Sequence, residues 1–260
     1  MPSITVITIC FNNLSDLQKT CASVDTQNVH PLEHWIIDGS TSTEIKEWLH
    51  NEPQPAYRKW VNERDAGIAD AFNKGIRLAS GEILHLLNSG DIYVNEKTLS
   101  IVSNIFDDNK QVQWVSGKLN VSRAGHWIEI GKPFEKSKLY RGMRSVSHPT
   151  MFLRKGIYSR NGLFNLNYKI AMDYDLICRI ANEPYEFINC PLATFDDTGV
   201  SSVNYLKSLK ENIIVYESYF GFSFKCRLWQ LRLKFLYLLL QTALGKWLFK
   251  LKKKMGLENA

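Results

Sequence analysis

Residues 65–91, DAGIADAFNKGIRLASGEILHLLNSGD, begin and end on an aspartate. The apolar run at residues 83–87 is typical of a buried strand in a parallel sheet, and Asn88, Ser89 and Gly90 end it with turn-forming residues. Ligands of open α/β sheets bind at the carboxyl ends of the strands. Asp91 is therefore placed where a metal-bound ligand would lie, although an aspartate after a strand, taken alone, is more often a turn or helix-cap residue.

The segments around this stretch alternate between β-branched runs and apolar residues at helical spacing. In the first half, strands are expected at residues 4–10, 34–38, 60–62 and 83–87, and helices at 14–26, 44–49 and 69–78, the last with Gly81 as C-cap. In the second half, strands are expected at 113–121, 127–130 and 186–189, a helix at 173–182, and at 134–147 a basic polar loop able to cover a ligand. This alternation predicts an α/β fold with a mostly parallel central sheet flanked by helices.

The charge of the chain is divided unevenly. The 260 residues carry a net charge of +6, yet residues 222–260 hold nine Lys or Arg and one Glu, which leaves −2 for residues 1–221. We therefore expect one domain at 1–221 and a basic helical appendage at 222–260. A mildly acidic body argues against nucleic acid as a partner, because a phosphate backbone is bound through Lys and Arg.

The five cysteines, Cys10, Cys21, Cys178, Cys190 and Cys226, are scattered and form no CxxC pair. An odd number of cysteines without metal-ligand spacing favours a reducing cytosol. The amino-terminal sequence MPSITVITIC has no basic region before its apolar residues, so it is expected to be a first strand rather than a secretion signal.

Six motifs occur in one order: ITVITICFNN, WIIDGSTS, ERDAGIADAFNKGIRLASGE, LNSGD, SHPTMFLRK and AMDYDLICRI. Together, over residues 3–200, they resemble the nucleotide-sugar glycosyltransferases of glycosyltransferase family 2, and among them the bacterial enzymes that build surface polysaccharides. The resemblance implies a GT-A-like nucleotide-diphospho-sugar transferase fold. Many members carry two aspartates at the metal motif, where this chain has Gly90 and Asp91.

The resemblance implies a pocket for the donor nucleotide. Asp38, which ends the second strand, suits a hydrogen bond from a pyrimidine N–H, and Asp65 matches a second position of the same pocket. For both aspartates a turn or N-cap role stays open. The other positions expected to bind the donor nucleotide are Ile9, Phe11, Asn12, Asn73 and Lys74.

The remaining chemistry falls to three later residues. Asp91 is expected to bind Mn²⁺ or Mg²⁺, since a hard cation needs only one or two protein carboxylates when a diphosphate supplies other oxygens. Asp173 matches the general base of inverting members, with Met172 in place of the usual Glu. Asp175 competes for that role, and Asp173 as an N-cap is a further alternative. His148 matches the family segment on the acceptor side.

The basic appendage alternates cationic and bulky apolar residues up to residue 254. Its longest uncharged stretch, residues 235–245, is 11 residues long, short of the ~20 that span a bilayer as a helix. We expect one or two helices that lie in the headgroup region of an anionic membrane. The alternative is a helix packed on the domain with a solvated basic face.

These features predict a metal-dependent, inverting glycosyltransferase that is cytoplasmic and peripheral on the inner face of the cell membrane. It would move a sugar from a nucleotide diphosphate donor to a lipid-linked saccharide in surface-polysaccharide biosynthesis. Among the nucleotides, UDP is the favoured one. The alternatives are a non-catalytic sugar-nucleotide or membrane-binding protein and a nucleotidyltransferase, whose Gly-rich phosphate loop is missing from FNNLSD. The sequence leaves the sugar, the acceptor and the oligomeric state open.

Overall fold

The computed structural model describes the chain except residues 124–125, 197–203, 246 and 249–260. Five of the nine basic residues of the appendage, Lys246, Lys250, Lys252, Lys253 and Lys254, thus lie outside the described residues. The strands are β1 (Ile4–Cys10), β2 (Glu33–Asp38), β3 (Arg58–Asn62), β4 (Ile83–Leu86), β5 (Ile92–Tyr93), β6 (Trp114–Arg123), β7 (His126–Ile130), β8 (Phe152–Arg154) and β9 (Tyr185–Asp196). The helices are α1 (Leu14–Asp25), α2 (Glu44–Asn51), α3 (Ile68–Leu78), α4 (Thr98–Asp108), α5 (Gly156–Asn161), α6 (Met172–Arg179), α8 (Tyr205–Phe220) and α9 (Phe224–Gln241), with the 3-10 turns η1 (Lys136–Arg141) and η2 (His148–Thr150).

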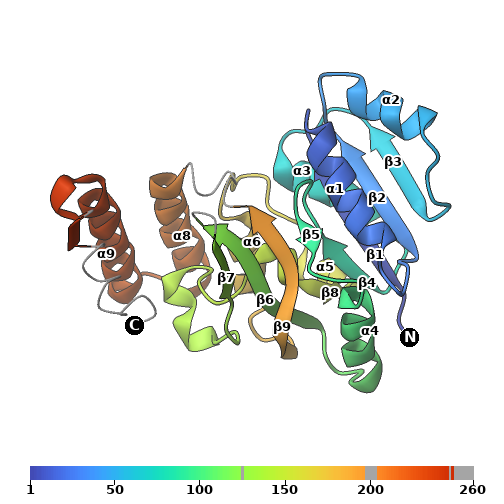
Figure 1. Ribbon diagram of the computed structural model, residues 1–260. Helices are drawn as coiled ribbons and strands as arrows, with labels where there is room; N and C mark the ends of the chain where they lie inside the picture. The colour runs from blue at the N-terminus through green and yellow to red at the C-terminus, as the bar shows by residue number, and fades with distance from the viewer. Residues whose placement is uncertain (124–125, 197–203, 246, 249–260) are drawn as a thin grey trace.

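One curled sheet joins the strands in the order β3-β2-β1-β4-β8-β6-β9-β5, with β7 paired to β6 (Figure 1). The first four strands are parallel, which confirms the α/β class predicted from the alternating elements. After β3 the chain returns to the other side of β1 and forms β4. Such a reversal opens a crevice at the carboxyl ends of the strands, and β1, β2 and β4 all end at that edge.

The second half of the sheet is mixed. Strand β8 runs antiparallel to β4 and β6, whereas β6 and β9 form a long parallel pair. Strand β7 forms the expected antiparallel hairpin with β6. The strand expected at residues 186–189 is longer, because after an irregularity in register near Lys118 β9 continues beside β6 to Asp196.

Helix α3 packs directly on β1 and β2. A Cβ on Gly75 would lie 2.3 Å from Cγ2 of Ile7, so this approach requires glycine. Phe72 and Ile76 fill the buried face of the helix. Gly81 is not the C-cap that the sequence predicts: the helix ends at Leu78, and Ala79 is already extended.

Residues 134–147 are more ordered than the predicted loop. They contain the turn η1, whose Leu139 and Tyr140 are buried. The hydroxyl of Tyr174 on α6 donates to the carbonyl of Leu139 at 2.5 Å. This segment is therefore held against the helix that carries Asp173.

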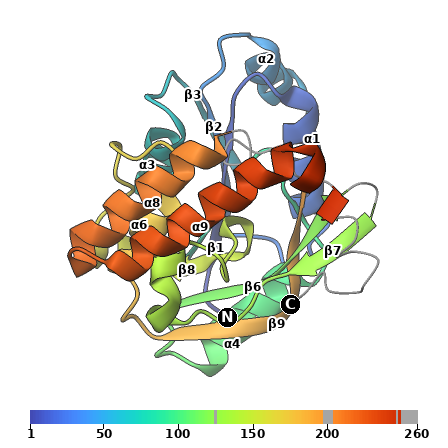
Figure 2. The same cartoon turned by 90° about the vertical axis from the view of Figure 1, so that its left-hand side faces the viewer.

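Helices α8 and α9 lie side by side across one face of the molecule (Figure 2). The inner face of α9 buries Cys226, Gln230 and Leu233, and Gln230 donates to the carbonyl of Tyr140 at 3.3 Å. The appendage therefore packs on the rest of the chain through residues 224–241. Among the described residues, none of the helices combines the length and hydrophobicity needed to cross a membrane.

Candidate active site

Asp38 stands at the end of β2, where its carboxylate is only 3 % exposed. The amide N–H of Ser40 donates to Oδ1 at 3.0 Å, and Asn62 Nδ2 donates to Oδ2 at 2.8 Å. Asn62 is the register partner of Asp38 on the neighbouring strand. The sequence analysis did not select Asn62, although its place at the end of the next parallel strand was a signal for it.

Asp65 lies directly over Gly39. A Cβ on Gly39 would be 2.1 Å from Asp65 Oδ2, so glycine at this position lets the carboxylate approach the end of β2. The amide of Gly67 donates to Asp65 Oδ1 at 2.9 Å. Asp65 is partly exposed, and of these two aspartates it is the one whose carboxylate a ligand can reach more easily.

The residues that follow β1 shape the same edge. Asn12 adopts a left-handed conformation (φ 51°), and its Oδ1 accepts the amides of Thr41 and Ser42 at 3.0 and 3.1 Å. Asn12 therefore ties two loops together and does not present a free amide to a nucleotide. Phe11, by contrast, is 60 % exposed just after the strand, and Ile9 is partly buried.

Two of the residues expected to bind the nucleotide have other partners. The amide of Asn73 is buried and exchanges two 2.9 Å hydrogen bonds with the backbone of Phe164. Lys74 donates to the carbonyl of Arg64 at 2.6 Å and pairs with Glu63 at 3.1 Å. Both side chains hold other segments of the chain in place in this structure, and their contact with a donor nucleotide stays a prediction.

Asp91 follows β4 at the same sheet edge and is 3 % exposed. Burial raises the pKa of its carboxyl to about 6, partly offset by His148 and by hydrogen bonds from Asn88. The Oγ of Ser89, two residues earlier in the chain, is buried and has no hydrogen-bond partner in the described structure. A buried carboxylate and an unsatisfied hydroxyl in the same turn fit a cation that takes its other ligands from a diphosphate and water.

No larger ligand set is present: the described residues contain no cluster of three or more His, Cys, Asp or Glu side chains able to hold a metal ion. This agrees with the single aspartate of the sequence motif. Any cation here would depend on the donor for most of its coordination.

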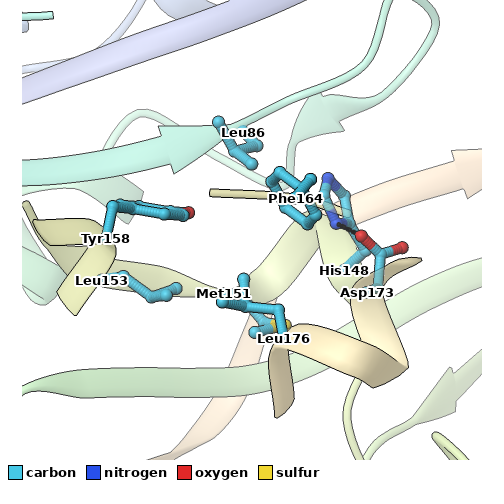
Figure 3. A pocket seen from close by; sticks show the side chains of 8 residues that line it. All are labelled: Leu86, His148, Met151, Leu153, Tyr158, Phe164, Asp173 and Leu176. Atoms are coloured by element: carbon cyan, nitrogen blue, oxygen red, sulfur yellow. Dashed lines mark hydrogen bonds and ion pairs between the residues drawn. The ribbon is translucent and has the colours of Figure 1, made fainter. Parts of the chain in front are cut away.

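Asp173 and His148 form a hydrogen-bonded pair of side chains in the candidate site (Figure 3). Nδ1 of His148 lies 2.9 Å from Oδ1 of Asp173. The side chain of Asp173 is 21 % exposed, and that of His148 12 %. Oδ2 of Asp173 has no hydrogen-bond partner among the described residues. Because Asp173 is the second residue of α6 and Ala171 is the N-cap, the N-cap alternative for Asp173 does not hold.

Asp175 faces the other way, as its distance of two residues from Asp173 predicts. It is 1 % exposed and pairs with Arg179 at 2.9 Å. The hydroxyl of Tyr219 donates to its other oxygen at 2.7 Å. Both oxygens of Asp175 are therefore engaged inside the protein, whereas one oxygen of Asp173 has no partner within the described part of the chain.

A small cavity lies behind the pair of Asp173 and His148. Its other walls are mainly apolar and consist of Leu86, Met151, Leu153, Tyr158, Phe164 and Leu176. The hydroxyl of Tyr158 is buried without a hydrogen-bond partner in the described structure. The sequence contained no signal for Tyr158, because its relation to Asp173 depends on the packing of α5 beside α6.

The parallel sheet reverses its strand order between β3 and β4, and carboxylates stand at the carboxyl ends of neighbouring strands. This arrangement is typical of α/β enzymes that bind nucleotides at that edge of the sheet. The model of the Glycosyl transferase family 2 domain matches residues 5–162. An uncharacterised glycosyltransferase of Mycobacterium tuberculosis is 33% identical over 214 residues, 77% of this chain and 78% of that protein. The chain belongs to glycosyltransferase family 2 and is a glycosyltransferase.

More distant proteins agree with this assignment. A PGL/p-HBAD biosynthesis glycosyltransferase of Mycobacterium bovis is 23% identical over 203 residues, 76% of this chain and 78% of its own length. The S. aureus TarS 1-349 structure in complex with UDP-GlcNAc superposes with a TM-score of 0.60 at 14% identity, over 84% of this chain and 67% of that one. The mannosyltransferase PcManGT from Pyrobaculum calidifontis, in complex with GDP-Man and Mn²⁺, has a TM-score of 0.60 at 16% identity, over 99% of this chain and 81% of that one. These likenesses confirm the GT-A fold.

Proposed function

We propose that the protein transfers a sugar, with inversion, from a nucleotide diphosphate donor to a saccharide hydroxyl, with Asp173 as general base. The observation that carries this proposal is the state of the Asp173 carboxylate. His148 holds one oxygen, the other has no hydrogen-bond partner among the described residues, and the side chain is partly exposed. In a single displacement the acceptor oxygen bonds to the anomeric carbon, Asp173 takes the hydroxyl proton, and the bond from the anomeric carbon to the diphosphate breaks.

The donor would lie along the carboxyl ends of β1, β2 and β4. Phe11 offers an exposed ring for the base, and Asp65 a reachable carboxylate for a base N–H. Asp38 shapes the floor of this pocket through its bonds to Ser40 and Asn62. A carboxylate that accepts from a pyrimidine N–H favours UDP as the first donor to test. The solved relatives support both uridine and guanosine donors, since one holds UDP-GlcNAc and the other GDP-Man.

Asp91, with Ser89 in the same turn, would hold Mn²⁺ or Mg²⁺ against the diphosphate. When bound, such a cation neutralises the charge of the leaving group as a Lewis acid. The protein residues supply one carboxylate and an enclosed position for it, which supports a cation bound tightly only together with the nucleotide. The Mn²⁺ in the PcManGT structure is consistent with this arrangement.

We further propose a lipid-linked saccharide as acceptor, in surface-polysaccharide or glycolipid assembly, with the enzyme at the inner face of the cell membrane. The outer face of α9 supports a membrane partner. Five large apolar side chains follow one another at spacings of four, three, four and three residues and are 47% to 71% exposed: Phe224, Leu228, Leu231, Phe235 and Leu238. At about 100° per residue this is one continuous stripe, opposite the buried face of α9.

Cations border that stripe on both sides. By helical position, Lys225 and Arg232 lie along one side and Arg227 and Lys234 along the other. An apolar stripe between two basic rows fits a helix that lies in the headgroup region of an anionic bilayer. The division at residue 221 accordingly separates a catalytic part from a membrane-binding part.

A thermal-shift comparison of UDP and GDP, each with and without Mn²⁺, tests the donor and metal assignments. A ligand at 100 times its dissociation constant stabilises by about 2.7 kcal/mol. We expect one nucleotide to raise the melting temperature more with Mn²⁺ than alone, and Asp91→Asn to remove that difference. Slow release of the matching nucleoside diphosphate from its nucleotide sugar should then be lost in Asp173→Asn. A wild-type protein that binds the nucleotide but releases none would instead be a binding module.

A further inference from the structure

We propose that His148 is a positioning residue: it fixes the orientation of the Asp173 carboxylate through Nδ1 and does not contact the acceptor. This inference rests on the proposed function of Asp173. A positioning role would replace the acceptor-side role that the sequence predicts for His148. The surroundings of the two ring nitrogens support this inference.

The first observation concerns Nδ1. It lies 2.9 Å from Asp173 Oδ1. A carboxylate oxygen only accepts hydrogen bonds, so Nδ1 carries the hydrogen of this bond. The bond engages Oδ1 and leaves Oδ2 without a partner among the described residues, so the carboxylate has one defined oxygen to take a proton.

The second observation concerns Nε2. This atom is buried and has no hydrogen-bond partner in the described part of the structure. The ring also packs against Phe72, with ring centres 5.1 Å apart. An acceptor hydroxyl therefore cannot meet Nε2 without displacing core residues, whereas Asp173 is the more exposed member of the pair.

The segment that carries His148 is itself held by a residue of β4. His85, a buried residue of β4, lies with Nε2 3.1 Å from the carbonyl oxygen of Pro149 and with Nδ1 2.8 Å from the hydroxyl of Tyr93. The ring of His85 also stacks on Phe152 with centres 3.8 Å apart. The segment of His148 is thus held in place by a residue of the sheet. His148 in turn restrains the side chain of Asp173 at the start of α6.

The electrostatic surroundings agree with this geometry. Desolvation lowers the pKa of His148, but the carboxylates of Asp173 and Asp91 and the backbone of Leu86 together raise it by more. In the transfer step the acceptor proton moves to Asp173 Oδ2 as the new glycosidic bond forms and the nucleoside diphosphate leaves. His148 keeps its Nδ1 hydrogen throughout, so no second proton transfer is required.

Three substitutions separate positioning from other roles. The side-chain amide of His148→Asn reaches the place of Nδ1, that of His148→Gln reaches the place of Nε2, and His148→Ala offers neither. We expect Ala and Gln to lower kcat for release of nucleoside diphosphate about 10- to 100-fold, since misplacing a reacting group by about 1 Å costs up to 10²-fold. We expect Asn to recover most of the rate, with KM for the nucleotide sugar within about twofold in all three variants.

The assay uses the nucleotide sugar whose nucleotide and Mn²⁺ give the largest thermal shift. Met151→Leu, a volume-conserving change in the wall of the same cavity, is the matched control and should retain the wild-type rate. Equal losses in Asn, Gln and Ala, or a full rate in Ala, would overturn the positioning role. If Asp173→Asn itself kept its rate, the proposed function would fail instead, so the two failures are distinguishable.

Discussion

Asp175 and Arg179, one turn apart on α6, form an enclosed pair in which Nε and Nη2 of the guanidinium donate to the same carboxylate oxygen at 3.1 and 2.9 Å. Arg179 also donates to the carbonyl of Leu163 at 3.0 Å. The pair therefore joins α6 to the segment that follows α5. This makes Asp175 a structural residue and separates it from Asp173, its competitor for the role of base.

The two aspartates should respond differently to the same substitution. Asp173→Asn should lower kcat by about 10² to 10⁴-fold, the usual contribution of a general base, with little change in melting temperature. Asp175→Asn should lower the free energy of unfolding by about 3 kcal/mol, because it leaves Arg179 without its buried partner. Rates and thermal unfolding measured on both variants check this. A greater loss of kcat in Asp175→Asn at unchanged stability would contradict the assignment.

Gly39→Ala should weaken nucleotide binding without unfolding the protein. The new Cβ would lie only 2.1 Å from the present position of Asp65 Oδ2, so that oxygen would have to move. Only the end of a flexible side chain has to move, so stability should change little while the carboxylate leaves the pocket. Calorimetry with the nucleotide and Mn²⁺ should give an affinity reduced as in Asp65→Asn. Unchanged affinity in both variants would remove Asp65 from the donor site.

The protein should lose stability in mild acid because of two buried histidines. Burial lowers the pKa of His34, with Arg58 adding to the effect, and burial lowers the pKa of His85 to about 3. Below pH ~6.5 the unfolded chain binds protons that these folded imidazoles do not. Their contribution is thus complete above that pH and declines as the pH falls, by up to about 1.4 kcal/mol per pH unit for each histidine.

Melting temperatures at pH 7.5 and 5.0 measure this decline. His148, whose pKa is raised, acts in the opposite direction, so the comparison needs a variant. His85→Gln should be less stable than the wild type at pH 7.5, yet it should lose less between the two pH values. An equal or steeper decline in the variant would show that His85 is not the source.

The apolar stripe of α9 should be required for binding to anionic vesicles. Leu231→Ser combined with Phe235→Ser should weaken the binding constant for phosphatidylglycerol vesicles, measured by co-sedimentation, at least tenfold, because about 0.8 kcal/mol is lost for each CH₂ no longer inserted and about 1.4 kcal/mol is a tenfold change. Ile214→Ser, at an exposed apolar position of α8, is the control and should bind normally. High salt should weaken the wild-type interaction. Equal binding to neutral vesicles would contradict the role of the flanking cations, and a dimer abolished by the double substitution would identify a second copy as the partner.

The parallel half of the fold was predictable because its signals are local. The β-branched run of β1 and the Asp-Gly-Ser after β2 each mark a strand and its end within a few residues. Gly81 was misassigned because the end of α3 depends on its packing against the sheet. Helix α4 is absent from the expected elements, although Leu99, Val102 and Phe106 stand at helical spacing on its buried side.

The sequence motifs name residues of the candidate site but not the contacts between them. Asp38, Asp65, Asp91 and Asp173 stand out from their motifs, whereas their partners come from distant segments. Asn73 binds the backbone of Phe164, and His148 meets Asp173, only because segments far apart in the chain fold onto one another. A single sequence carries no signal for such pairings, so a motif residue that supports the site resembles one that contacts the ligand.

Glu211 on α8 accepts the amides of both Ile170 and Ala171 through Oε2, each at 2.9 Å, and so holds the chain immediately before α6. The family model matches only residues 5–162, yet the residues that lead into the helix of Asp173 are held by a side chain from well beyond that range. A fragment that ends before α8 would therefore leave the amides of Ile170 and Ala171 without this partner. A chimera with a relative would have to exchange α6 and α8 together.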